Sequence, residues 1–311
     1  MKRLSRDAFD RARQFLRTES RPLERALFEV HFEATSAARV AEELATFQNE
    51  DGGFGKALEP DLRTPSSSAL STSIGLRILK DLRCPAGLAM VRRAVQYLLN
   101  TFDDATRVWR VAPRDANDHP HAPWWHEENG SLARTFDNYV INPRAELMGL
   151  LHHYAVLVPD DWLFDVTEDT VAAIEAMEPL GTGGGDDLSC AIRLAETGKV
   201  PDHFRERLVN RIRAAVPTVV CRDAKAWNTY CITPLKLAQS PQSLAADLLW
   251  DDLQQNLDFV IEQQNQNGCW EPVWSWGECY PEAWELARQE WRGWLTLDNL
   301  LVLGAFGRIE P

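Results

Sequence analysis

The stretch "FQNEDGGFG", residues 47–55, has a counterpart near the far end of the chain, "QQNQNGCW", residues 263–270. Residues 48–54 align with residues 264–270 without a gap, and both stretches end on an aromatic residue. The first of them directly follows a segment with the spacing of an amphipathic helix. The chain therefore makes one kind of turn twice, in regions far apart in the sequence.

Each residue type in these turns has a predicted structural role. The glycines supply backbone conformations that other residues avoid. The aromatic residues fill the gap between neighbouring helices, and the glutamines satisfy free backbone groups at helix ends. The residues concerned are Gly52, Gly53 and Gly268, then Phe54 and Trp270, then Gln48 and Gln264.

The rest of the chain shows helices of two kinds and no sustained alternation typical of strands. Half-exposed helices carry one apolar stripe, as in 202–215, whereas buried helices such as 145–157 are apolar or small nearly all round. Half-exposed helices are predicted near 6–17, 36–47, 87–101, 163–177, 202–215 and 244–264, and buried helices near 22–32, 66–80, 143–157, 187–196, 230–238 and 293–306. Six of each in alternation predict an all-α (α/α)6 toroid, with six inner and six outer helices in a single domain over 1–311.

The composition of the chain argues against several classes of function. The net charge of −13 argues against a broad nucleic-acid surface and against docking on anionic lipid. No segment has the length and apolarity of a signal peptide or a membrane span. The six cysteines are scattered without a CxxC pair, so reduced thiols and a cytoplasmic location are expected. The oligomeric state is not predicted.

The two turns resemble the QW-type repeats of the terpenoid cyclase and protein prenyltransferase superfamily. In that family a Gln and an aromatic residue after a Gly-containing turn tie an outer helix to the next inner one. The family fold is the (α/α)6 toroid, which agrees with the helix alternation. The resemblance implies an apolar, isoprenoid-type small molecule bound or transformed in the barrel cavity, where aromatic faces stabilise cations.

The same resemblance implies an acidic residue that donates a proton to the substrate. Protonation-type cyclases carry a D-x-D-D motif entering an inner helix, and this chain has Gly184-Gly185-Asp186-Asp187 at the matching place. The proton donor of that family maps to Asp186, while Gly184 replaces the first acid. The alternative is that Asp186 or Asp187 caps the helix that follows.

No metal or other cofactor is predicted. Prenyltransferases of the superfamily hold zinc with Asp, Cys and His, for which Asp223 and Cys231 are the candidates here. The segment 293–306 contains no His, and the histidines show no ligand spacing tied to Cys231. The stretch "DDLQQ" at 251–255 lacks the third acid of a magnesium-binding DDxxD motif and is interpreted as surface charge.

The predicted toroid would place several loops together at one end of the barrel, called the rim. If all inner helices run in the same direction, the loops before them gather at one end of the barrel. The predicted catalytic residues there are Glu59, Asp61, Asp186 and Asp187, and the predicted substrate-binding residues are Arg63, Asp137, Tyr139, Arg144, Tyr230, Trp274, Trp276, Trp291 and Arg292. Acids, arginines and aromatic residues converging on a cavity mouth suit a binding or catalytic site.

Two further interpretations stay open. Other (α/α)6 barrels act on carbohydrates with paired carboxylates, which would set Glu59 or Asp61 opposite Asp186 or Asp187. The chain could also be a non-catalytic toroid that binds a partner through its rim. In a purely structural interpretation of the rim, the arginines Arg63, Arg144 and Arg292 only pair with Glu59, Asp61 and Asp137 to hold the loops together, and Trp274 and Trp276 only pack.

Overall fold

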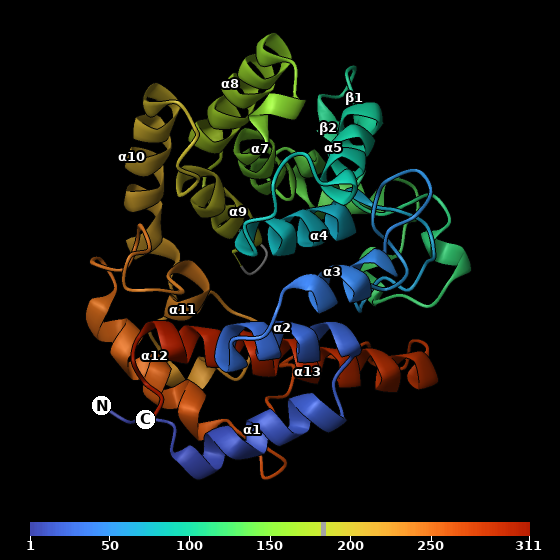
Figure 1. Cartoon of the computed structure of the whole chain (residues 1–311). Helices are drawn as coiled ribbons and strands as arrows, with labels where there is room; N and C mark the ends of the chain where they lie inside the picture. Colours follow the sequence, from blue (N-terminus) through green and yellow to red (C-terminus); the bar gives the residue numbers. More distant parts are fainter. Residues whose placement is uncertain (182–184) are drawn as a thin grey trace. The chain divides into compact units, whose positions relative to one another are not determined.

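The structure, a computed structural model, describes residues 1–181 and 185–311 (Figure 1). Helices make up 57% of the chain, which confirms the all-α class. In the described part the regular strands are limited to a short antiparallel hairpin of β1 (Phe102–Asp103) and β2 (Val108–Trp109). None of the described helices has both the length and the apolarity needed to cross a membrane.

Contacts gather the helices into two compact units, one of residues 1–44 and 220–311 and the other of residues 45–219. The helices of the first are α1 (Arg6–Thr18), α2 (Pro22–Glu33), α3 (Ala38–Ala45, whose last residue begins the other unit), α11 (Pro234–Leu237), α12 (Trp250–Glu262) and α13 (Pro281–Ala305). Those of the second are α4 (Ala69–Asp81), α5 (Ala89–Thr101), α6 (Ser131–Thr135), α7 (Arg144–His153), α8 (Asp160–Ala176), α9 (Asp186–Ala195) and α10 (Asp202–Val219). The single domain over 1–311 stays a prediction.

The 45–219 unit is built around three buried helices. α7 packs against α4 on one side and α9 on the other, while α5, α8 and α10 pack against α4, α7 and α9 respectively. Every residue of α7 except His153 is buried, as its nearly all-apolar sequence predicts. Gly149 lets α7 approach α9, because a Cβ atom there would lie 3.3 Å from the Cα atom of Leu194.

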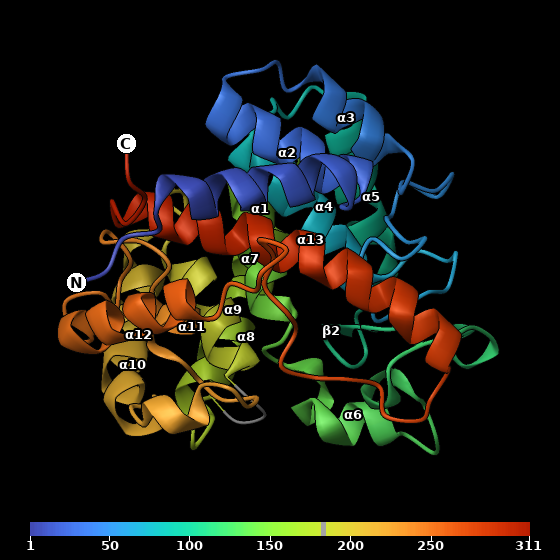
Figure 2. The same ribbon diagram turned by 90° about the horizontal axis from the view of Figure 1, so that it is seen from below.

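In the 1–44 and 220–311 unit, α1, α2 and α13 pack against one another, and α11 packs against α12. Figure 2 shows α1 lying along α13. The two end segments of the chain pair here, because Leu4 N–H donates to Arg308 O (2.7 Å) and Glu310 N–H donates to Leu4 O (3.0 Å). The first helix is thereby held beside the last one.

Two buried helices differ from their predicted bounds. α11 has a single turn instead of spanning 230–238, because Pro234 stands at its first position, where it cannot continue a helix from 230. α13 begins at Pro281 rather than near 293. Trp284 and Ala287, three residues apart, are buried on one face and extend the apolar stripe by three turns toward the N-terminus.

The two turns of the repeat make the same hydrogen bonds. Gln48 Nε2 donates to Gly52 O (2.9 Å) and to Met90 O in the first turn of α5 (3.0 Å). Gln264 Nε2 donates to Gly268 O (3.0 Å) and to Ala8 O in the first turn of α1 (2.9 Å). The glutamines therefore bond backbone groups as predicted. Their partners are carbonyls at the start of a neighbouring helix, however, and not the unpaired groups at a helix end.

The aromatic residues of the turns are also held alike. Phe54 N–H donates to Thr72 Oγ1 in α4 (3.0 Å), and Trp270 N–H donates to Thr296 Oγ1 in α13 (3.3 Å). Both aromatic side chains are buried, which confirms that prediction. The first turn follows α3 and the second follows α12, both predicted as half-exposed helices. Each turn thus joins a half-exposed helix to the buried helix that follows.

Glycine is required at the centre of both turns. Gly52 has φ +94° and Gly268 has φ +88°, a region that other residues rarely occupy. A Cβ atom on Gly52 would lie 2.5 Å from Arg93 O in α5, and one on Gly268 would lie 2.6 Å from Arg11 O in α1. The turns therefore press directly on the backbone of the neighbouring helix.

Candidate functional site

The predicted site residues divide between the two units. The 45–219 unit contains Glu59, Asp61, Arg63, Asp137, Tyr139, Arg144, Asp186 and Asp187. The other unit contains Tyr230, Trp274, Trp276, Trp291 and Arg292. That all of them share one cavity stays a prediction.

The loop before α4 is buried along most of its length, which is unusual for a connecting segment. Glu59 is 7% exposed and Asp61 is 3% exposed. The loop is fixed against the segment 120–122, because Ala122 N–H donates to Asp61 O (2.8 Å) and Arg63 N–H donates to Pro120 O (3.2 Å). Two carboxylates are thereby held inside the unit by backbone contacts.

Three aromatic side chains that follow the segment 120–122 in the sequence stack on one another. The Trp125 ring stacks on Phe136 with centroids 5.1 Å apart, and Phe136 stacks on Tyr139 at 6.0 Å. Burial is the main cause that raises the pKa of Tyr139 to about 12, so its hydroxyl keeps its proton at neutral pH. Asp137 is exposed at the rim of this stack. Trp125 and Tyr139 are buried and Phe136 is half-buried, so the stack is packed inside the unit.

Backbone strain marks the same region. Asp137, Asn138 and Tyr139 have consecutive φ values of 46°, 56° and 62°, and Lys56 and Ala57 have φ values of 54° and 59°. A non-glycine residue in this region costs on the order of 1 kcal/mol or more, and such residues gather at functional sites. The strained pair Lys56 and Ala57 lies just before the buried acid Glu59. The other strained segment contains Tyr139.

The predicted proton donor stands at the start of α9. Gly185, with φ +86°, occupies the cap position, so Asp186 and Asp187 are the first two helical residues and not the cap. Both still lie where the helix dipole favours a negative charge. Asp186 is half-buried, and Asp187 is 8% exposed. Gly184, which replaces the first acid of the cyclase motif, lies outside the described residues.

One ionic cluster in this unit was not predicted from the sequence. Glu146 in α7 accepts hydrogen bonds from Arg77 in α4 (2.5 Å) and from Arg193 in α9 (2.9 Å). Burial alone would raise the pKa of Glu146, but the charges of Arg193 and Arg77 outweigh it and lower the pKa to about 2. The signal was present in the sequence, because a charged residue on a helix that is otherwise apolar needs a partner.

Arg144 is held between two helices. Its Nε donates to Thr170 Oγ1 of α8 (2.8 Å), and its Nη2 donates to Val166 O (3.4 Å). Burial lowers the pKa of Arg144 to about 10, with Asp169 opposing the shift. These contacts join α7 to α8, and a role of Arg144 in substrate binding stays a prediction.

The other unit gathers its predicted residues around tryptophans. The rings of Trp274 and Trp291 meet edge to face with centroids 5.0 Å apart, and Trp276 packs on Trp284 at 5.6 Å. Arg292 forms an ion pair with Glu271 (2.7 Å). The remaining residue, Tyr230, is exposed, and its ring lies 4.9 Å from Lys236 Nζ. Apart from Tyr230, this group is a packed aromatic cluster beside an ion pair.

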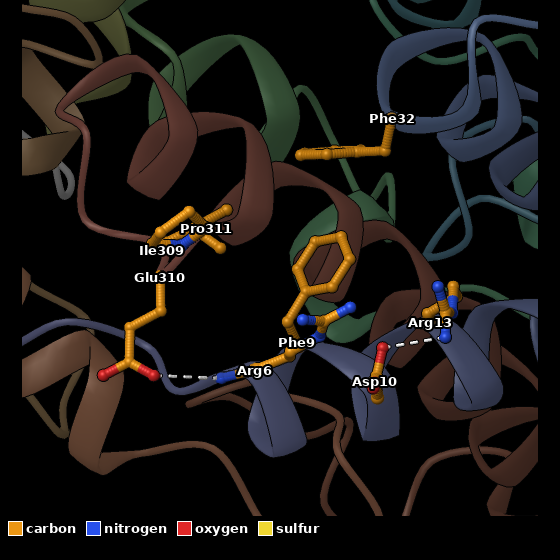
Figure 3. A pocket seen from close by; sticks show the side chains of 8 residues that line it. All are labelled: Arg6, Phe9, Asp10, Arg13, Phe32, Ile309, Glu310 and Pro311. Atoms are coloured by element: carbon orange, nitrogen blue, oxygen red, sulfur yellow. Dashed lines mark hydrogen bonds and ion pairs between the residues drawn. The ribbon is translucent and has the colours of Figure 1, made fainter.

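A surface hollow of about 390 Å³ lies elsewhere in this unit, between α1, the end of α2 and the last residues of the chain. Figure 3 shows Phe9 and Phe32 facing it, with Asp10 paired to Arg13 at one side. It includes none of the predicted site residues. Among the described residues no three His, Cys, Asp or Glu side chains meet as a metal site would require, Asp223 and Cys231 included.

Comparisons with protein-family models, with curated proteins and with solved structures each find no match for this chain. The resemblance to terpenoid cyclases therefore rests on the two turns and on the helix alternation alone.

Proposed function

We propose that this chain is a carbohydrate-active α/α toroid whose buried acids in the 45–219 unit act on a sugar-type ligand. The observation that carries the proposal is the burial of Glu59, Asp61 and Asp187 within one compact unit. Acidic side chains are seldom this buried unless a partner or a function holds them. Hydrolysis or cleavage of a glycosidic bond uses two carboxyl groups, one as acid and one as base or nucleophile.

The toroid is part of the same proposal. Buried and half-exposed helices alternate along the chain, and in each unit neighbouring helices of the two kinds pack together. The two equivalent turns support a repeated unit of one half-exposed and one buried helix. In this arrangement the loops before α4 and α9 lie at the same end, which brings Glu59 and Asp61 to the end that holds Asp186 and Asp187.

The roles of the residues follow from their surroundings. Asp186, half-buried at the start of α9, is the proposed proton donor, and Glu59 or Asp61 is the proposed second carboxylate. Phe136, the half-buried ring of the stack with Trp125 and Tyr139, is the proposed aromatic contact for a sugar ring.

Thermal denaturation of the intact chain with a ligand panel tests this proposal. The panel contains neutral and acidic trisaccharides, farnesol and farnesyl diphosphate. A sugar that binds should raise the melting temperature by roughly 2 °C or more at saturating concentration. Asp187→Asn and Asp186→Asn should lose the shift, whereas Asp251→Asn, an exposed acid in α12, should keep it. A panel without any sugar-induced shift, or shifts that survive both substitutions, would contradict the proposal.

An isoprenoid-type ligand is the second candidate function. It is favoured by the resemblance of both turns to the cyclase repeats and by the tryptophans around Trp274 and Trp291. Their rings could stabilise a carbocation through their negative faces. A shift with farnesol or farnesyl diphosphate, and none with sugars, would select this function over the first.

A further inference from the structure

Two cysteines lie close together in the segment between α10 and α11. Cys221 N–H donates to Ile232 O (2.8 Å), which sets Cys221 beside Cys231, the residue preceding Ile232. Both cysteines are free and half-buried. The pairing puts the two cysteines on neighbouring backbone segments, which a disulfide requires.

The two thiols also donate to carbonyls of the same turn. Cys221 Sγ donates to Asp223 O (3.8 Å), and Cys231 Sγ donates to Ala226 O (3.5 Å). These carbonyls belong to a single turn, which Ala226 N–H closes by donating to Asp223 O (2.9 Å). Burial first, and then the neighbouring thiol of Cys221, raise the pKa of Cys231 to about 11.

We infer that Cys221 and Cys231 form a modification site, at which a peroxide converts the two thiols into a disulfide. The bond would close the segment 221–231, which carries Trp227 and Tyr230. Trp227 is already fixed inside this segment, because its Nε1 donates to Cys221 O (2.8 Å). Tyr230 is exposed, and the disulfide would restrict the backbone that positions it.

The chemistry balances with hydrogen peroxide as the oxidant. One cysteine, as the thiolate, attacks a peroxide oxygen, so an S–O bond forms, the O–O bond breaks, and the hydroxide that leaves takes the thiol proton to become water. The second thiolate then attacks the sulfur of this sulfenic acid. An S–S bond forms, the S–O bond breaks, and the hydroxide that leaves takes the proton of the second thiol to become a second water. The two sulfurs together lose two electrons, and the peroxide gains them.

Closing this segment removes freedom from the unfolded chain. A loop of this length is expected to raise the melting temperature of the whole protein by roughly 2–5 °C. The gain should disappear when the bond is reduced with a thiol reagent. Neither effect depends on the proposed carbohydrate function.

Peptide mapping by mass spectrometry, after mild peroxide treatment of the folded chain, tests the inference. The expected result is one linked peptide that joins Cys221 to Cys231 and lacks two hydrogens. This link should form faster in the folded chain than in urea, and it should be absent in Cys221→Ser and Cys231→Ser. Cys279→Ser, which removes an exposed cysteine of the same unit, is the matched control and should form the link normally.

Two outcomes would overturn the inference. One is separate oxidation of Cys221 and Cys231 to sulfinic acids without a link between them. The other is a link that forms no faster in the folded chain than in urea, because the fold then contributes nothing to the pairing.

Discussion

At the scale of single residues, the glycines of the two turns have the most restricted positions in the fold. Gly52→Ala and Gly268→Ala should each lower the free energy of unfolding by about 2 kcal/mol or more, because the added Cβ meets helix backbone at a positive φ. Gly87→Ala is the control, since a Cβ atom there meets open space. Urea unfolding measures all three, and two turn variants as stable as Gly87→Ala would contradict the geometry.

Glu146 gives a prediction that depends on pH. Glu146→Gln leaves two arginines without their partner and should cost roughly 2–4 kcal/mol at pH 7. The pKa of Glu146 is lowered from 4.5 to about 2 in the folded chain, so its contribution is complete above about pH 5 and is lost as the pH falls toward 2. The difference between wild type and variant should therefore shrink over this range. A difference that stays constant down to pH 2 would show that the pair is not ionic.

The residue scale also shows what the sequence could reveal of the candidate site. The acids Glu59 and Asp187 could be predicted as site residues from the sequence. Glu59 lies in a loop between two helical segments, and Asp187 lies at the start of one. The cluster around Glu146 was missed because its three members lie far apart in the sequence, each on a different helix. Only the packing of α4, α7 and α9 brings them together.

At the scale of elements, the equivalence of the two turns predicts equivalent costs. Thr72→Val and Thr296→Val remove the acceptor of a buried N–H while keeping the side-chain shape, so each should cost about 1–3 kcal/mol. Thr35→Val, at an exposed position, is the control and should stay within about 0.5 kcal/mol of wild type. Unequal losses at the two threonines would mean that the turns are alike in sequence only.

Helices with a clear apolar stripe could be predicted, and the first turns of α13, which lack one, could not. The apolar stripe of 202–215 locates α10, because a helix with one apolar face has one way to bury it. α13 was predicted too short because its first turns mix tryptophans with charged residues and follow a loop rich in Gly and Trp. There the burial of Trp284 and Ala287 by the rest of the unit, and not the local pattern, decides the structure.

At the scale of the whole molecule, the repeat gives the chain ends a role. The second turn leads into α13, the last helix of the chain, and contacts α1, the first helix. The first turn presses on α5, which directly follows α4. The pair of α13 and α1 therefore corresponds to the pair of α4 and α5.

The central claim is that the buried acids of the 45–219 unit bind a sugar-type ligand. Hydrogen–deuterium exchange of the intact chain tests it most directly, measured with and without the trisaccharide that raises the melting temperature most. Slower exchange is expected in residues 55–66 and 185–191, the segments that carry Glu59, Asp61, Asp186 and Asp187. Unchanged exchange in both segments, with protection confined to residues 220–311 or found nowhere, would contradict it.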